Sequence, residues 1–184
     1  TDDIRAFTTA QMVALTTAQV PSFTTSQLPA FTTAQLAAME TADVVVLTTN
    51  QLRALASTQV PGLTTAQVAN LTTAQVAGLA STQIGGLSST QVAAMTTAQI
   101  GLLRADQVGQ LTTSQLNNLT STQLQSLAGK QLTSVTTAQM ASLTTANLAL
   151  LNNSQASALS ATQLNALGNS QVSALTSTVL SSIN

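Results

Sequence analysis

The sequence contains no Cys, His, Trp or Tyr, and only 5% of its 184 residues are charged. General acid–base catalysis usually needs a His, or a carboxylate whose pKa its surroundings have tuned. The chain offers five scattered carboxylates, those of Asp2, Asp3, Glu40, Asp43 and Asp106. No Ser has a His that would activate it as a nucleophile. The composition therefore predicts a protein without enzymatic activity.

The same absences count against metal centres and cofactors. Zinc and iron–sulfur sites need Cys or His ligands. Calcium needs several clustered oxygen ligands, with carboxylates among them. Only Asp2 and Asp3 are adjacent, and two acidic residues at a chain end are typical of a solvated terminus. We therefore expect no metal site and no cofactor.

Nucleic acid and membranes are also unexpected partners. The four cations, Arg5, Arg53, Arg104 and Lys130, are too few and too dispersed for a nucleic-acid footprint. Three Phe residues provide no stacking platform for bases. Mean hydropathy is +0.30, yet no apolar run approaches the roughly 18 residues of a membrane span. No charged segment followed by an apolar one opens the chain, so no signal peptide is expected in it.

An eight-residue unit repeats from residue 8 to residue 183 without insertion or deletion, which gives 22 octads. The first of them, Thr8–Leu15, reads TTAQMVAL, and residues 1–7 fit the phase as a partial earlier copy. A disordered tract need not keep its register, whereas a stacked array must. The sequence therefore predicts one ordered repeat array over residues 1–184, of the solenoid type.

The eight positions follow distinct rules. Positions 5 and 8 are apolar in every octad, so their side chains are the expected core. The core residues predicted in this way include Leu15, Phe23, Phe31, Leu47, Leu63, Val68, Leu71, Val76, Leu79 and Leu87. Position 4 is Gln in 19 octads, and its exceptions are Asp43, Asn147 and Val179. Positions 1–3 are mostly Thr, Ser and Ala, while positions 6 and 7 hold all three prolines.

Neither a continuous helix nor a continuous strand fits this spacing. Eight helical residues advance by about 800°, about 80° beyond two full turns, so the apolar stripe would wander around the helix. In a strand, positions 5 and 8 would point to opposite faces. The chain must therefore bend within every octad.

The junction between octads carries a helix-start motif. Thr64 stands where an N-cap residue belongs and Gln67 stands at the third helical position, which together make the S/T-x-x-Q capping box. Leu63 and Val68 flank it as the accompanying hydrophobic pair. Pro or Gly at positions 6 and 7 is then expected to end each helix.

The glutamines are expected to serve as caps or as hydrogen-bonding links between successive turns, although a recognition ladder for sugars is an alternative. The residues assigned to this role are Gln11, Gln19, Gln27, Gln35, Gln51, Gln59, Gln67, Gln75, Gln83, Gln91, Gln99 and Gln107.

Two folds remain in competition. A β-solenoid with two octads per turn would suit Thr, Val and Ile, and would stack Gln as a ladder. Ala56, Ala80 and Ala128 also weaken the helical interpretation, because Ala at the cap position cannot accept the capping bond. Abundant Ala and Leu, however, favour helix. We therefore predict an all-α solenoid of very short capped helices, one per octad, with the β-solenoid as the alternative.

The unit LTTAQVA, present at residues 63–69 and 71–77, resembles the octapeptide arrays of some very large secreted or surface-attached bacterial proteins. The resemblance covers essentially the whole chain and implies a stalk, an adhesin or a matrix component that is extracellular or on the cell surface. It carries no catalytic residues over to this sequence.

The expected function is accordingly structural or adhesive. Identical turns present identical surfaces at a fixed pitch, which gives many individually weak contacts. Repeat-to-repeat contacts that do not close generate filaments, and the low surface charge offers little repulsion against them. We therefore expect a homo-oligomer or filament, with a surface or matrix ligand as a further partner. The alternative is a module that binds ice, glycan or another solid surface through rows of Thr, Ser and Gln.

Overall fold

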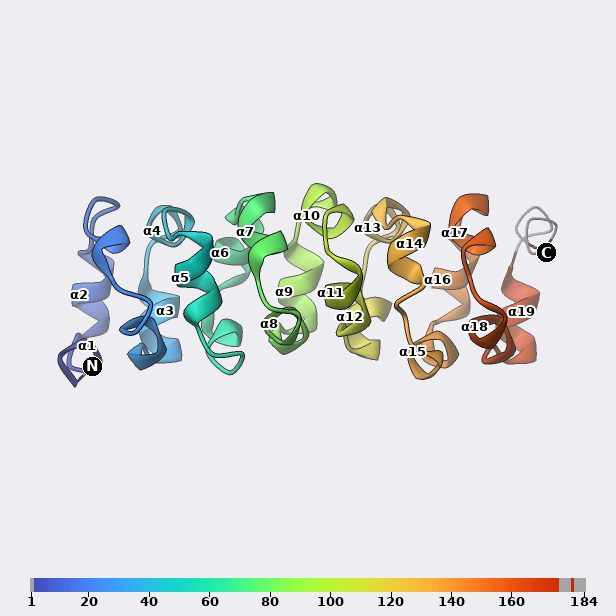
Figure 1. Cartoon of the computed structure of the whole chain (residues 1–184), viewed down its shortest axis with the longest axis horizontal. Helices are drawn as coiled ribbons and strands as arrows, with labels where there is room; N and C mark the ends of the chain where they lie inside the picture. The colour runs from blue at the N-terminus through green and yellow to red at the C-terminus, as the bar shows by residue number, and fades with distance from the viewer. Residues whose placement is uncertain (1, 176–179, 181–184) are drawn as a thin grey trace. The chain divides into compact units, whose positions relative to one another are not determined.

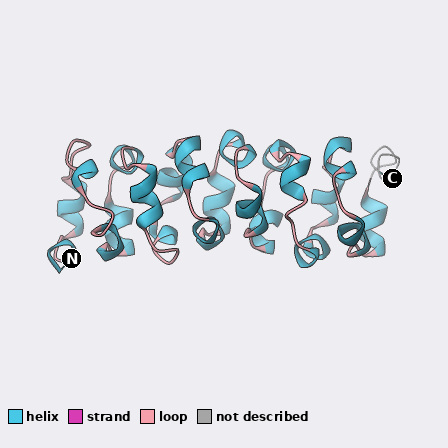
Figure 2. Cartoon of the chain, viewed as in Figure 1, coloured by secondary structure: helices cyan, strands magenta, loops and turns pink. Residues whose placement is uncertain are grey.

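The structure is a computed structural model that describes residues 2–175 and residue 180. Every octad in residues 2–175 forms one short helical element, and this part of the chain contains no strand (Figure 2). The prediction of an all-α fold with one very short helix per octad is confirmed, and the β-solenoid is not supported.

The chain divides into two compact units, residues 1–95 and residues 96–184. The first unit contains α1 (Asp2–Arg5), α2 (Thr9–Val13), η1 (Val20–Ser22), η2 (Leu28–Ala30), α3 (Thr33–Ala38), α4 (Thr41–Val45), α5 (Thr49–Ala54), η3 (Val60–Gly62), α6 (Thr65–Asn70), α7 (Thr73–Gly78), α8 (Ser81–Gly86) and α9 (Ser89–Ala94) (Figure 1). The second contains α10 (Thr97–Gly101), α11 (Ala105–Gly109), α12 (Thr113–Asn117), α13 (Ser121–Ser126), α14 (Gly129–Leu132), α15 (Thr137–Ser142), α16 (Thr145–Ala149), α17 (Asn153–Ser157), α18 (Ala161–Asn165) and α19 (Asn169–Ala174). The single array over residues 1–184 stays a prediction.

The helices begin at the capping box. Thr64 is extended, with φ −74° and ψ 159°, and its hydroxyl accepts the backbone N–H of Gln67 at 3.1 Å. The Gln67 side chain in turn accepts the backbone N–H of Thr64 at 2.7 Å. Ala80 lacks the hydroxyl, yet its N–H still donates to Gln83 Oε1 at 2.8 Å. The glutamine half of the box is therefore enough to start a helix.

The helices end without the help of glycine, contrary to the sequence prediction. Helix α7 ends at Gly78 and α6 ends at Asn70, the same position of the octad. In both octads the next residue, Leu79 or Leu71, turns to an extended conformation. No described residue has a positive φ. The helix stops because the position-8 residue leaves the helical conformation, whether or not Gly precedes it.

Glycine has a packing role instead. A Cβ added to Gly78 would lie 1.8 Å from Cγ2 of Thr49 at the start of α5. The absence of a side chain therefore lets α7 approach α5 closely.

Proline changes the type of helix. Pro21, Pro29 and Pro61 are the middle residues of η1, η2 and η3, the three 3₁₀ elements of the described residues. Proline has no N–H to donate to the carbonyl four residues earlier, so the α-helical hydrogen bond is missing there. The backbone N–H groups instead donate to carbonyls three residues earlier, as in the bond from Gly62 N to Gln59 O at 2.8 Å.

Within each unit, a helix packs against the helix three octads further along the chain. Helix α6 packs on α9 and α5 on α7 in the first unit, while α10 packs on α13 in the second. Each element thus supplies one side of a thin core that its neighbour completes, as in other solenoids.

Positions 5 and 8 supply this core. Of the predicted core residues, eight are buried: Phe31, Leu47, Leu63, Val68, Leu71, Val76, Leu79 and Leu87. Leu15 and Phe23 are only half-buried, although Met12 and Val20 at position 5 of the same octads are fully buried. The ring of Phe23 meets that of Phe31 edge to face, with centroids 5.1 Å apart.

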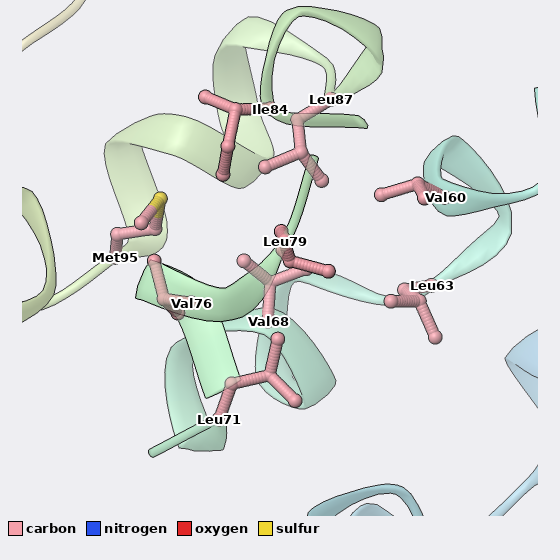
Figure 3. A pocket seen from close by; sticks show the side chains of 9 residues that line it. All are labelled: Val60, Leu63, Val68, Leu71, Val76, Leu79, Ile84, Leu87 and Met95. Atoms are coloured by element: carbon pink, nitrogen blue, oxygen red, sulfur yellow. The ribbon is translucent and has the colours of Figure 1, made fainter. Parts of the chain in front are cut away.

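Within the first unit, the core around Val68 and Val76 encloses only a very small cavity. Nine apolar side chains, among them Val68, Leu79 and Ile84, line a cavity of about 10 Å³. Figure 3 shows these side chains from close by. A volume of this size is at the lower limit for a single water molecule, and no polar group lines it. This part of the first unit's interior is therefore packed and has no room for a ligand. No described helix has the length and apolar character needed to cross a membrane.

Candidate functional site

The position-4 glutamines lie inside the units rather than on their surfaces. From Gln35 to Gln171 each of them is at most 8% exposed. A buried polar group is costly unless it is hydrogen-bonded. The position of the amide oxygen and nitrogen therefore decides what these residues do.

Gln67 illustrates how both ends of the amide are used. Its Oε1 accepts the backbone N–H of Thr64 in its own octad at 2.7 Å. Its Nε2 donates to two main-chain carbonyls of an earlier turn, Leu36 O at 2.9 Å and Met39 O at 2.7 Å. One neutral side chain thus caps a helix and ties that helix to the turn before it.

The same arrangement recurs at a fixed register. Nε2 donates to the carbonyl 28 residues earlier, a position-8 residue, and to a second carbonyl 30 or 31 residues earlier. In the second unit, Gln155 bonds Leu124 O and Leu127 O, each at 2.8 Å. We call this set the glutamine ladder. It comprises Gln35, Gln51, Gln59, Gln67, Gln75, Gln83 and Gln91 in the first unit, and Gln131, Gln139, Gln155, Gln163 and Gln171 in the second.

Gln99 and Gln107 hold the N-cap end of the same arrangement. Gln99 Oε1 accepts the N–H of Thr96 at 2.7 Å, and Gln107 Oε1 accepts the N–H of Arg104 at 2.8 Å. Both side chains are buried.

Gln11, Gln19 and Gln27 make capping contacts but no link to another turn among the described residues. Their Oε1 atoms accept the N–H groups of Thr8, Thr16 and Thr24 at 2.8–3.0 Å. Their Nε2 atoms bond no described residue. Gln11 and Gln19 are exposed and Gln27 is half-buried. The sequence left capping and linking between turns open for the glutamines, and among the described residues these three make the capping contact.

The exceptions at position 4 show what the ladder requires. Asn147 is one methylene shorter than Gln and reaches Leu116 O only at 3.4 Å. It also makes no capping box, since Thr144 N bonds the side chain of Asn117 instead. Val179 lies outside the described residues. Asp43 is 2% exposed, and its Oδ2 has no hydrogen-bond partner among the described residues. The sequence marked Asp43 as an exception but gave no sign that it is buried.

The outer face of each octad carries hydroxyls and little charge. Thr64, Thr65 and their counterparts Thr96 and Thr97 are exposed. Arg104 and Asp106 form a surface ion pair at 3.0 Å, and the hydrogen bond from Arg104 lowers the pKa of Asp106. No three His, Cys, Asp or Glu side chains gather in the part of the chain that the structure describes.

Comparison with known protein families identifies this repeat. The sequence profile of the ALTTAQ repeat matches residues 1–33, 36–73, 62–89, 70–97 and 76–113, together more than half of the chain. No curated protein matches the sequence. Four of the five matches overlap, as expected of a short tandem repeat, and the prediction of an octapeptide repeat array is confirmed. The chain belongs to the ALTTAQ repeat family.

Proposed function

We propose that this chain is a structural repeat protein on the outside of a bacterial cell, where it forms a rod, a fibre or the stalk of an adhesin. In this role the chain acts as a spacer and makes many weak contacts through its repeated surface, and it catalyses no reaction. Copies associate with one another through their repeated outer faces. The resemblance to octapeptide arrays of secreted and surface-attached proteins supports the location.

The glutamine ladder is the observation that carries this proposal. Each rung uses main-chain carbonyls as acceptors, so it does not depend on which side chains the earlier turn carries. A rung such as Gln67 to Met39, at 2.7 Å, is therefore compatible with any octad that keeps Gln at position 4. Octads can be added without a new kind of contact, which is the property that a long spacer needs.

The length of the molecule in solution tests the spacer role. We expect a variant in which residues 64–111 are duplicated in phase to have a larger maximum dimension than the original chain. The added length per octad should equal that of the original octads, and small-angle X-ray scattering measures it. A matched control inserts the same residues in shuffled order, which keeps composition but removes the register. A flexible insert extends only with about the square root of its length. Equal growth of the two chains would argue against the spacer role.

Self-association is tested separately. Sedimentation velocity across a range of concentrations should show species larger than the monomer, and negative-stain microscopy should show fibres in dilute buffer. If the protein is a monomer at every concentration, the proposed fibre is wrong and only the role as a stalk stays possible.

A surface-binding module is the second candidate, favoured by the exposed hydroxyls. Thr64, Thr65, Thr96 and Thr97 are examples of the outward-facing Thr pairs that recur at positions 1 and 2. A regular hydroxyl array is suited to ice, glycan or another solid surface. Thermal hysteresis or glycan-array binding by the monomer would favour this function over the structural one.

A further inference from the structure

Asp43 places a carboxylate where other octads place an amide. Its side chain is 2% exposed, and Oδ2 bonds no described residue. In the octads on either side, Gln35 and Gln51 occupy the same position, and each donates Nε2–H to two carbonyls of an earlier turn. Asp43 thus brings oxygen atoms to a location where its neighbours bring hydrogen-bond donors.

The register of the ladder identifies the carbonyls that stand opposite. Gln35 bonds the carbonyls 28 and 31 residues earlier. The residues at these two offsets from Asp43 are Leu15, which follows α2, and Met12, which lies in α2. Asn147, whose side chain has the same length as that of Asp43, reaches the carbonyls of Leu116 and Asn117, 31 and 30 residues earlier, at 3.4 Å and makes no bond to the carbonyl 28 residues earlier. By this register we expect the carboxylate of Asp43 near carbonyl oxygens of that earlier octad, to which it brings no hydrogen-bond donor. Oxygens arranged in this way repel one another unless a proton or a bound cation lies between them.

A second carboxylate adds to the negative charge. Glu40 is the N-cap residue of α4, three residues before Asp43. Burial, and then the nearby Glu40 carboxylate, raise the pKa of Asp43. Neither residue forms an ion pair with a described residue.

We propose that Asp43 binds a hard cation of the Ca²⁺ class between its carboxylate and the main-chain carbonyls of Met12 and Leu15, with Glu40 supplying the second negative charge. Ca²⁺ prefers carboxylate and carbonyl oxygens, and takes its remaining ligands from water. In the two neighbouring octads the electropositive Nε2 group lies 2.7–3.1 Å from the equivalent carbonyls. The cation takes the place of that group, so it restores the tie between α4 and the preceding turn.

The sequence did not predict this site because half of its ligands are main-chain oxygens. A search for clustered acidic residues finds only the pair Asp2 and Asp3, and the carbonyls of Met12 and Leu15 leave no mark in the pattern of residue types. The proposal does not depend on the function proposed above.

Calcium titration of the full chain tests the proposal. We expect a heat of binding near neutral pH for one site per chain, measured by calorimetry with CaCl₂ after treatment with EDTA. Hydrogen exchange of residues 9–45 should slow when Ca²⁺ is added, while that of the second unit should not change. Even a change outside the first ligand shell weakens metal sites by about 10–100-fold, so Asp43→Asn should weaken binding by at least about tenfold.

Two variants make the test specific. Asp43→Gln installs the amide of the neighbouring octads and should be stable without responding to Ca²⁺. Asp106→Asn removes an exposed carboxylate of the second unit and should leave the binding intact. Calcium binding by Asp43→Asn equal to that of the original chain, or no binding by the original chain, would overturn the proposal. In the second case Asp43 is a protonated acid that donates to a carbonyl.

Discussion

Replacing Gln67 by Leu should destabilise the first unit more than the loss of a helix cap explains. The substitution removes three hydrogen bonds, to Thr64 N at 2.7 Å, Met39 O at 2.7 Å and Leu36 O at 2.9 Å. Losing a cap contact alone costs about 0.5–2 kcal/mol. Leaving the buried carbonyls without a donor adds about 1–3 kcal/mol, because their desolvation is no longer compensated. Part of the loss is offset by burying Leu, and we expect a net loss of about 2–4 kcal/mol.

Gln11→Leu is the matched control. Gln11 makes the same capping box, with Thr8 N donating to its Oε1 at 2.8 Å, but it is exposed and its Nε2 bonds no described residue. Only the cap contribution should be lost, about 0.5–2 kcal/mol. The difference between the two variants therefore isolates the bonds between turns.

Hydrogen exchange is the measurement of choice, because a chain with two units need not unfold in a single step. In Gln67→Leu, amides near Met39 and Thr64 should exchange faster, on both sides of the broken rung. Urea unfolding followed by circular dichroism gives the overall loss. If Gln67→Leu costs no more than Gln11→Leu, the ladder does not hold the turns together.

Three further changes test other parts of the fold. Gly78→Ala should destabilise by about 1–3 kcal/mol, because its Cβ would meet Thr49 Cγ2 at 1.8 Å, and thermal unfolding measures this loss; an unchanged melting temperature would contradict the close approach of α7 to α5. Asn147→Gln should stabilise by about 1 kcal/mol, because it brings the donor from 3.4 Å to normal hydrogen-bond distance, and slower exchange of the amides next to its carbonyl partners would report it. The stability that the Arg104–Asp106 pair contributes should be present above pH about 4 and lost as the pH falls through the lowered pKa of Asp106. Because both side chains are about half exposed, with 44% and 56% of their surface accessible, this loss should be under about 1 kcal/mol. Asp106→Asn should remove this part of the pH dependence of the free energy of unfolding. If the free energy of unfolding falls at low pH as much in Asp106→Asn as in the original chain, the pair contributes nothing.

The local structure of an octad follows from its sequence, because its rules act within a few residues. The box of Thr64 and Gln67 joins atoms three residues apart, and the apolar spacing of positions 5 and 8 marks the core directly. Both signals recur in octad after octad, so they identify the helix start and the buried positions.

The packing of turns does not follow in the same way. The 28-residue reach of Gln67 depends on how far the chain bends in each octad, and its acceptors are backbone atoms that no residue type identifies. The role of Gly78 was missed for the same reason, since only the neighbouring turn shows why Cβ is excluded. The prediction that glycine ends the helix was wrong because Leu79 reaches its extended conformation without a left-handed residue before it.

The choice of Gln at position 4 can now be explained from the chemistry of its side chain. The position needs one acceptor for the N-cap N–H and two donors for the carbonyls of an earlier turn, all on a neutral group, because it is buried. Glu has the length but only acceptors when ionised, and burial of its charge is costly. Asn has the atoms but is too short, as the 3.4 Å distances of Asn147 demonstrate. Gln alone meets the three requirements at once, so an octad that loses it must obtain the missing donor elsewhere, and Asp43 is the octad where a cation is the available substitute.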